Sequence, residues 1–161
     1  MIKNERGAAA ALVICMLPVL VITMAFAVDL GLLVWYRFTL MDVADLSALA
    51  GVQELDLEAL ADGEPRLLSG EATAAAVDYA RANVQARLGA TALNALEMHV
   101  QIYNGSEDSP LIHAHCGREL IHPTVCLQLS LPVPFVLVGH LSGREDIRVT
   151  AHADAAAVWR Q

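Results

Sequence analysis

The chain has 161 residues, a formal net charge of −8 at neutral pH and only 5% aromatic residues, although 56% of its residues are hydrophobic. The acidic balance excludes a nucleic-acid or anionic-lipid binder that relies on a basic patch, and the length allows one small domain beside a membrane segment. The sequence carries no phosphate-binding loop, hydrolase elbow or nucleophile–base motif, so we predict neither an enzyme nor a bound cofactor.

An uncharged apolar stretch covers residues 7–28, close to the start of the chain. As a helix rising about 1.5 Å per residue it reaches roughly 33 Å, enough for a hydrocarbon core of about 30 Å. We therefore expect one transmembrane helix in a lipid bilayer. Lys3 and Arg6 outweigh Glu5 on the short side, which predicts that residues 1–6 are a cytoplasmic stub and that the rest lies outside the cytoplasm.

A cleavable secretory signal is the alternative interpretation of this stretch, because Ala25-Phe26-Ala27 is similar to a small-x-small cleavage site. Cleavage after Ala27 would release a secreted or periplasmic binding module. The apolar run is longer than the usual signal core of about 7–15 residues, and the helical pattern continues beyond Ala27. Both observations favour a retained anchor.

Two polar or helix-breaking positions interrupt the apolar pattern. Pro18 removes one helical hydrogen bond and predicts a kink, which neighbouring helices can compensate in lipid. Asp29 stands at the outer edge, where a carboxylate is costly near hydrocarbon. We expect Asp29 either to be paired or to lie at the level of the headgroups.

No proline lies between Pro18 and Pro65, so we expect the helix to continue over residues 29–60 outside the membrane. Its charged face is narrow, and small residues on the other faces permit close helix approach. This part should be covered by its own domain or by neighbouring subunits. The positions expected to serve membrane contact and helix packing are Gly7, Pro18, Asp29, Gly31, Ala44, Ser47, Ala48 and Gly51.

Residues 61–161 are expected to form a small α+β ectodomain. A turn over Asp62–Pro65 precedes a helix that starts near Ser69, as a possible cap, and ends at Gly89. Three later segments alternate with the period of a strand, which predicts an antiparallel sheet of about three to four strands resting on the helices. These segments are Leu96–Tyr103, Val125–Val133 and Asp146–Val158.

Histidines and cysteines gather late in the chain, at His113, His115, Cys116, His122 and Cys126. Such donors at short separations can bind zinc, but paired Cys-x-x-Cys spacing is absent. In an exported domain a disulfide between Cys116 and Cys126 is the simpler interpretation, worth about 2.5–3 kcal/mol by loop entropy. We therefore predict the disulfide and no metal site, with the metal cluster as the alternative.

The first third of the chain also carries an ordered series of features. They are Arg6-Gly7 followed by alanines, Leu17-Pro18, Ala27-Val28-Asp29-Leu30-Gly31, and Leu40 to Gly51 with Asp42, Ala44, Asp45, Ala48, Leu49 and Ala50. This series resembles the N-terminal domain of the Flp pilus-assembly TadE/G-like family. The segments Leu131–Phe135 and Ile147–Ala153 are similar to a closing segment common in that family.

The resemblance implies a minor-pilin-like structural or assembly component of a bacterial Tad (tight-adherence) pilus or a related secretion and adhesion apparatus. It implies a single-pass protein of the bacterial inner membrane or the pilus, in a hetero-oligomeric assembly with other subunits of the machinery. Prepilin-like members carry a glutamate five residues after the processing glycine, where it pairs with the amino terminus of an incoming subunit. Counted from Gly7, that position is Leu12, which is closer to the TadG side and leaves cleavage at Arg6-Gly7 open.

Overall fold

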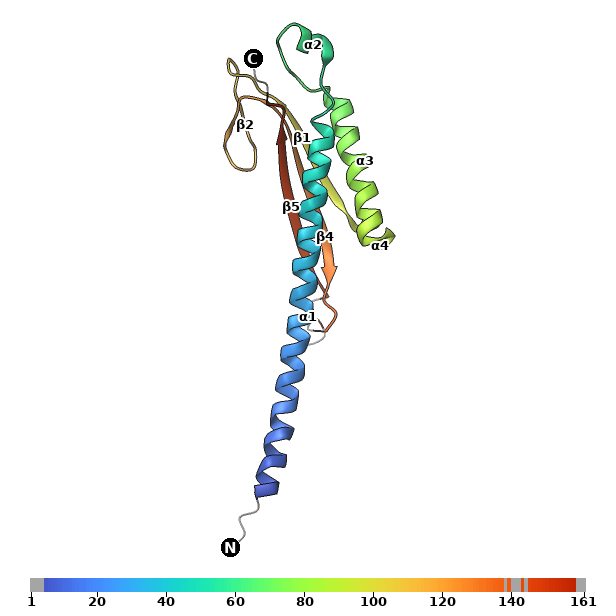
Figure 1. The fold of residues 1–161 in the computed structure, drawn as a ribbon, viewed down its shortest axis with the longest axis vertical. Coiled ribbons are helices and arrows are strands. Elements are labelled where there is room, and N and C mark those ends of the chain that lie inside the picture. Colours follow the sequence, from blue (N-terminus) through green and yellow to red (C-terminus); the bar gives the residue numbers. More distant parts are fainter. Residues whose placement is uncertain (1–4, 138, 140–142, 144, 159–161) are drawn as a thin grey trace. The chain divides into compact units, whose positions relative to one another are not determined.

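The computed structural model describes residues 5–137, 139, 143 and 145–158, which form an α+β chain as predicted (Figure 1). The chain divides into two compact units. The first consists of residues 1–36 and 133–147, and the second of residues 37–132 and 148–161. The elements in chain order are α1 Glu5–Gly51, α2 Leu57–Ala61, α3 Ser69–Leu88, α4 Ala90–Ala95, β1 Glu97–Asn104, β2 Leu111–Ile112, β3 Glu119–Leu120, β4 Pro123–Pro134 and β5 Asp146–Ala156.

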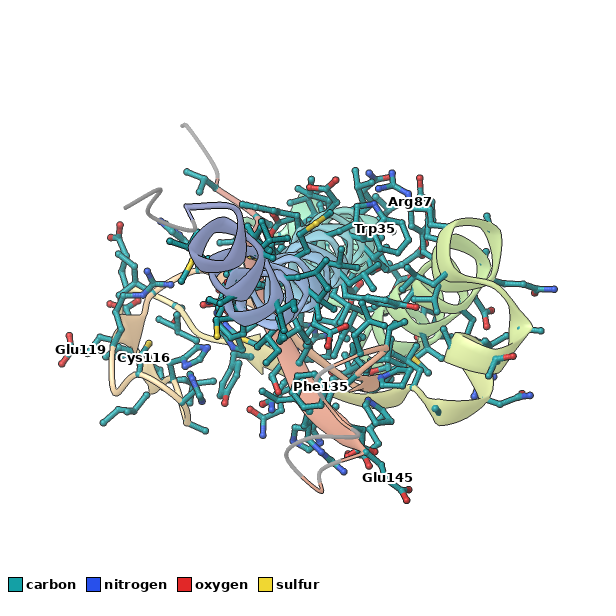
Figure 2. All side chains as sticks on the ribbon, turned by 90° about the horizontal axis from the view of Figure 1, so that it is seen from below. Trp35, Arg87, Cys116, Glu119, Phe135 and Glu145 are labelled. Carbon is teal, nitrogen blue, oxygen red and sulfur yellow. The ribbon has the colours of Figure 1, made fainter. Side chains whose placement is uncertain are left out.

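The first unit combines the apolar part of α1 with the connection between β4 and β5. Pro18 lies inside α1, where its missing N–H leaves the carbonyl of Ile14 without a helical donor. At the base of the connection, the N–H of Phe135 donates to the carbonyl of Glu145 over 3.1 Å, and Figure 2 labels both residues. The connection is therefore closed by its own backbone.

The long helix α1 ends at Gly51, so the expected continuation to Leu60 is wrong. The chain turns there, and Asp56 caps the separate short helix α2. Its carboxylate accepts the backbone N–H groups of Glu58 over 3.2 Å and of Ala59 over 3.1 Å. Aspartate stabilises the first turn of a helix in this way and is less favourable within one, which explains the break.

In the second unit, α3 runs antiparallel to the last turns of α1. At one end the backbone of Gly51 approaches Ala72 and Ala76, and at the other Arg87 Nη1 lies 3.3 Å from Asp42 Oδ2. Figure 1 shows this part of α1 beside α3. Because alanine is small, the two helices pack at close range along the buried side of α3.

The helix predicted from Ser69 to Gly89 is confirmed as α3. Gly89 follows it with φ of 86°, a backbone conformation that glycine adopts without strain. Ser69 is the first helical residue, and the cap position before it, Leu68, makes no side-chain cap. The face that α3 buries has a spacing of four residues and consists of Ala72, Ala76, Ala80 and Val84.

The three predicted strands are confirmed as β1, β4 and β5, which form one sheet with β4 in the centre. β1 pairs with β4 in antiparallel register, with Val100 opposite Leu127. Leu127, Leu129 and Leu131 are fully buried on one face of β4. Val125 shares that face and lies against Gly51 of α1, so the core of the second unit lies between the sheet and the helices.

β2 and β3 form a separate two-stranded antiparallel sheet that the sequence pattern did not predict. Each has only two residues, with Leu111 opposite Leu120. The loop between them carries His113, His115 and Cys116. Figure 2 shows Cys116 and Glu119 on this hairpin.

Candidate assembly interface and histidine pocket

Most side chains along the apolar part of α1 are exposed. Ile14 is 71% exposed and Met24 is 69% exposed. Only 6% of the most apolar 18-residue window is buried, so this segment is not the core helix of its own domain. By length and composition α1 is able to cross a membrane, a criterion that a signal sequence also meets. An exposed apolar surface of this extent requires lipid or protein to cover it.

Asp29 is buried within the first unit, at 4% exposure. Its Oδ1 accepts the backbone N–H of Val136 over 3.0 Å, and its two oxygens accept the N–H of Leu137 over 3.2 and 3.1 Å. The paired alternative expected for this carboxylate is therefore the one observed. Asp29 joins α1 to the connection between β4 and β5.

Replacing Asp29 by alanine should loosen this attachment, because both N–H groups lose a charged acceptor worth about 1.5–3 kcal/mol. Amide hydrogen exchange of the full-length protein in detergent micelles measures the effect. We expect Val136 and Leu137 to exchange at least about tenfold faster in Asp29→Ala. Asp29→Asn keeps one acceptor oxygen and should be intermediate, and equal protection in all three proteins would contradict the role of the carboxylate.

Ala44, Ser47 and Ala48 are all fully buried in the second unit. The Ser47 hydroxyl donates to the carbonyl of Val43 over 2.6 Å, so its buried oxygen is satisfied within the helix. We expected these small residues to be covered either by their own domain or by neighbouring subunits, and the chain's own domain covers them. They pack within its own domain.

Gly51 and Gly31 differ sharply in their surroundings. A Cβ at Gly51 would lie 2.8 Å from the backbone oxygen of Ala72 and 3.2 Å from Cβ of Ala76, whereas a Cβ at Gly31 would meet nothing within 4 Å. Of these two positions, packing therefore requires glycine only at position 51. Gly7 lies in α1, and its predicted role stays a prediction.

Gly51→Ala and Gly31→Ala should consequently change stability in opposite directions. The first forces backbone apart and should cost about 1–3 kcal/mol, while the second removes helix-interior glycine and should gain up to about 1 kcal/mol. Thermal unfolding followed by circular dichroism on the full-length protein compares them. A Gly51→Ala protein as stable as the unmodified chain would refute the close approach.

His113 is a structural residue of the β2–β3 hairpin, with only 1% exposure. Its Nδ1 accepts the backbone N–H groups of His115 over 3.1 Å and of Cys116 over 3.2 Å. These two donors assign the ring proton to Nε2, which lies 3.1 Å from Asp154 Oδ1 and donates to it. Both ring nitrogens of His113 are therefore in use.

A cavity of about 220 Å³ lies beside this hairpin in the second unit, and we name it the histidine pocket. Its lining residues are His99, Gln101, Ala114, His115, Cys126, Gln128 and His152. Of the five His and Cys residues predicted as a cluster, the lining includes His115 and Cys126. His113 stands behind it, and neither Cys116 nor His122 lines it.

His99, His152 and Asp154 were missed by sequence reasoning. They belong to strands β1 and β5, and the donor atoms of His152, Asp154 and His113 lie within 4.8 Å of one another. His-x-Asp at 152–154 places two polar side chains on one face of β5. This alternation can be read from the sequence, but it does not predict which strand lies beside β5.

Cys126 and Asp154 interact at the edge of the pocket. Burial raises the pKa of the Cys126 thiol, and a hydrogen bond to the Asp154 carboxylate raises it further. For Asp154, burial acts to raise the pKa, but hydrogen bonds from Cys126 and His113 outweigh it and leave the pKa below its usual value. In the structure Cys126 is buried and Cys116 exposed, both as thiols. The disulfide between them stays a prediction.

Comparison with known proteins adds one match. Residues 7–54, less than a third of the chain, match the sequence model of a family described as "Putative Flp pilus-assembly TadE/G-like". The match does not separate the TadE side from the TadG side. Comparisons with curated proteins and with solved structures find no match. The matched range covers nearly all of α1 and the turn after it, so the exposed apolar helix lies within the segment that is similar to this family.

Proposed function

We propose that this protein is a membrane-anchored, minor-pilin-like component of a Tad/Flp-type pilus or a related secretion and adhesion apparatus. The observation that carries the proposal is the apolar part of α1, which is exposed within the chain and lies inside the family match. Its role is to hold an exported domain among other subunits of the machinery. No catalytic step forms part of the proposed function.

In the proposed arrangement residues 7–28 cross the bacterial inner membrane and residues 1–6 remain in the cytoplasm. Residues 29–60 and the ectodomain of residues 61–161 lie on the periplasmic or extracellular side. The charge asymmetry around the span supports this orientation. Partners are other membrane subunits of the pilus machinery in a hetero-oligomeric assembly, and the absence of the recruiting glutamate at Leu12 supports the TadG side.

A released binding module, cut after Ala27, is the alternative function. Two observations favour the anchor: α1 is continuous through Ala27 and Val28, and Asp29 is held against the β4–β5 connection. Amino-terminal sequencing of the protein in the membrane fraction decides between the two. A first residue at or before Ala8 supports the anchor, whereas a mature start near Val28 defeats it.

The pilus role is tested in a strain that lacks the gene. Surface filaments, counted by electron microscopy, and attachment to a surface should both fall and should return on complementation. Immunogold labelling with an antibody against the ectodomain then separates a minor pilin, which labels filaments sparsely, from an assembly factor that labels only the cell envelope. Unchanged filaments and attachment in the deletion strain would reject the proposal.

A further inference from the structure

The sheet of the second unit has one apolar and one polar face. The register sets His99 opposite Gln128 and Gln101 opposite Cys126, so these four side chains share the polar face of β1 and β4. The opposite face, with Leu127, forms the core. His99 and His115 are exposed, so core packing does not account for these two imidazoles, whereas the Cys126 thiol is buried. Imidazole and thiol groups are metal ligands by chemistry.

The histidine pocket brings together four such groups from four parts of the fold. They are the imidazoles of His99 on β1, His115 on the hairpin and His152 on β5, and the thiol of Cys126 on β4. Nitrogen and sulfur donors of this kind suit zinc and copper rather than magnesium or calcium. The cavity of about 220 Å³ has room for an ion and bound water.

Asp154 orients the imidazole of His152. Its Oδ1 lies 3.4 Å from His152 Nε2 and 3.1 Å from His113 Nε2. A metal-binding histidine commonly donates its second ring N–H to a carboxylate, which leaves the other nitrogen for the ion. In this arrangement His152 binds through Nδ1, and Asp154 and His113 are positioning residues.

We infer that the histidine pocket binds one divalent transition-metal ion of the zinc class, with Cys126 and His152 as ligands and His99 and His115 as the further imidazole donors. The rings of His115 and His152 stack at 4.9 Å between centroids and 23° between planes. Nearly parallel rings cannot direct both in-plane lone pairs at one point. The exposed His115 therefore rotates when the ion binds, and His152 stays fixed.

The ion and the predicted disulfide compete for one sulfur atom. Binding deprotonates the Cys126 thiol, releases the proton to solvent and forms a metal–thiolate bond. A Cys116–Cys126 disulfide removes that ligand. The reduced protein should therefore bind the ion, and the disulfide-linked protein should not. This inference is independent of the pilus role.

Cobalt(II) is the first probe, because a thiolate ligand gives it a ligand-to-metal charge-transfer band and a tetrahedral site gives it strong visible absorption. The full-length protein, with a tag that contains no histidine, is titrated in detergent micelles with a phosphine reductant. We expect one Co²⁺ per chain, with both spectral features, and displacement by Zn²⁺. A folded, reduced protein without the charge-transfer band overturns the inference, and so does the same band in disulfide-linked protein.

Variants then assign the ligands. Cys126→Ser should abolish the charge-transfer band, and Asp154→Asn should weaken Zn²⁺ binding by about 10–100-fold while the band remains. His122→Ala is the matched control, since His122 does not line the pocket, and it should bind as the unmodified chain does. If the charge-transfer band persists in Cys126→Ser, the metal binds at another site. The titration of the unmodified protein decides the inference even where a variant fails to fold.

Discussion

Arginine at both Leu17 and Val21 should remove the protein from the membrane fraction. Each of these side chains is 58% exposed, and both lie near the middle of residues 7–28. One arginine at the centre of a transmembrane helix costs about 2.5–3.5 kcal/mol on insertion scales, so the pair costs about 5–7 kcal/mol. The measurement is the amount of full-length protein that remains in carbonate-washed membranes, followed through a C-terminal tag.

The control introduces two arginines at exposed positions outside α1. Leu57 is 75% exposed and Val158 is 67% exposed, both in the second unit. Leu57→Arg/Val158→Arg should remain in washed membranes at the level of the unmodified chain. If the Leu17→Arg/Val21→Arg protein is also retained there, the apolar part of α1 is not the anchor.

Leu127→Ala should have the largest effect on the stability of the second unit. Leu127 is fully buried on the central strand, opposite Val100, with the core on its side of the sheet. Truncating its isobutyl side chain to a methyl group leaves a cavity that strands β1 and β4 cannot close without breaking their pairing. Deletions of this kind cost about 2–5 kcal/mol. Thermal unfolding of the full-length protein in micelles measures the loss.

Ile112→Ala is the matched control for this substitution. It removes an aliphatic group of similar size from β2, where Ile112 is 67% exposed, and should change the free energy of unfolding by no more than about 0.5 kcal/mol. Equal losses in the two variants would show that the apolar face of β4 is not the core. A loss confined to Leu127→Ala supports the two-faced sheet.

The fold was predictable wherever the signal is local and repeated. The uncharged run of residues 7–28 and the alternation in β1, β4 and β5 needed only their own sequence. The end of α1 was missed because Gly51 and Asp56 look tolerable within a helix until capping is considered. The pairing of β2 with β3 was missed because two residues per strand carry no periodicity.

The histidine pocket shows a different limit. Sequence reasoning grouped His113, His115 and Cys126 because they lie close together along the chain. His99 and His152 lie far from them in the sequence and join the pocket only through the strand order β1-β4-β5. Strand order depends on long-range pairing, which the period of one strand cannot specify. Proximity in the sequence is also the reason why His122 was included in the predicted cluster, although it does not line the pocket.

Under the proposed function, the hydrogen bonds of Asp29 bear on how subunits would recognise one another in the bilayer. The resemblance described above implies that, in prepilin-like members of the family, an acidic side chain within the apolar helix recruits the next subunit. Here Leu12 stands at that position, and both oxygens of Asp29, the first acid after the apolar run, already accept backbone N–H groups of this chain. In the proposed arrangement, lateral contacts along residues 10–28 would therefore depend on shape, and Pro18 lies within this stretch of α1.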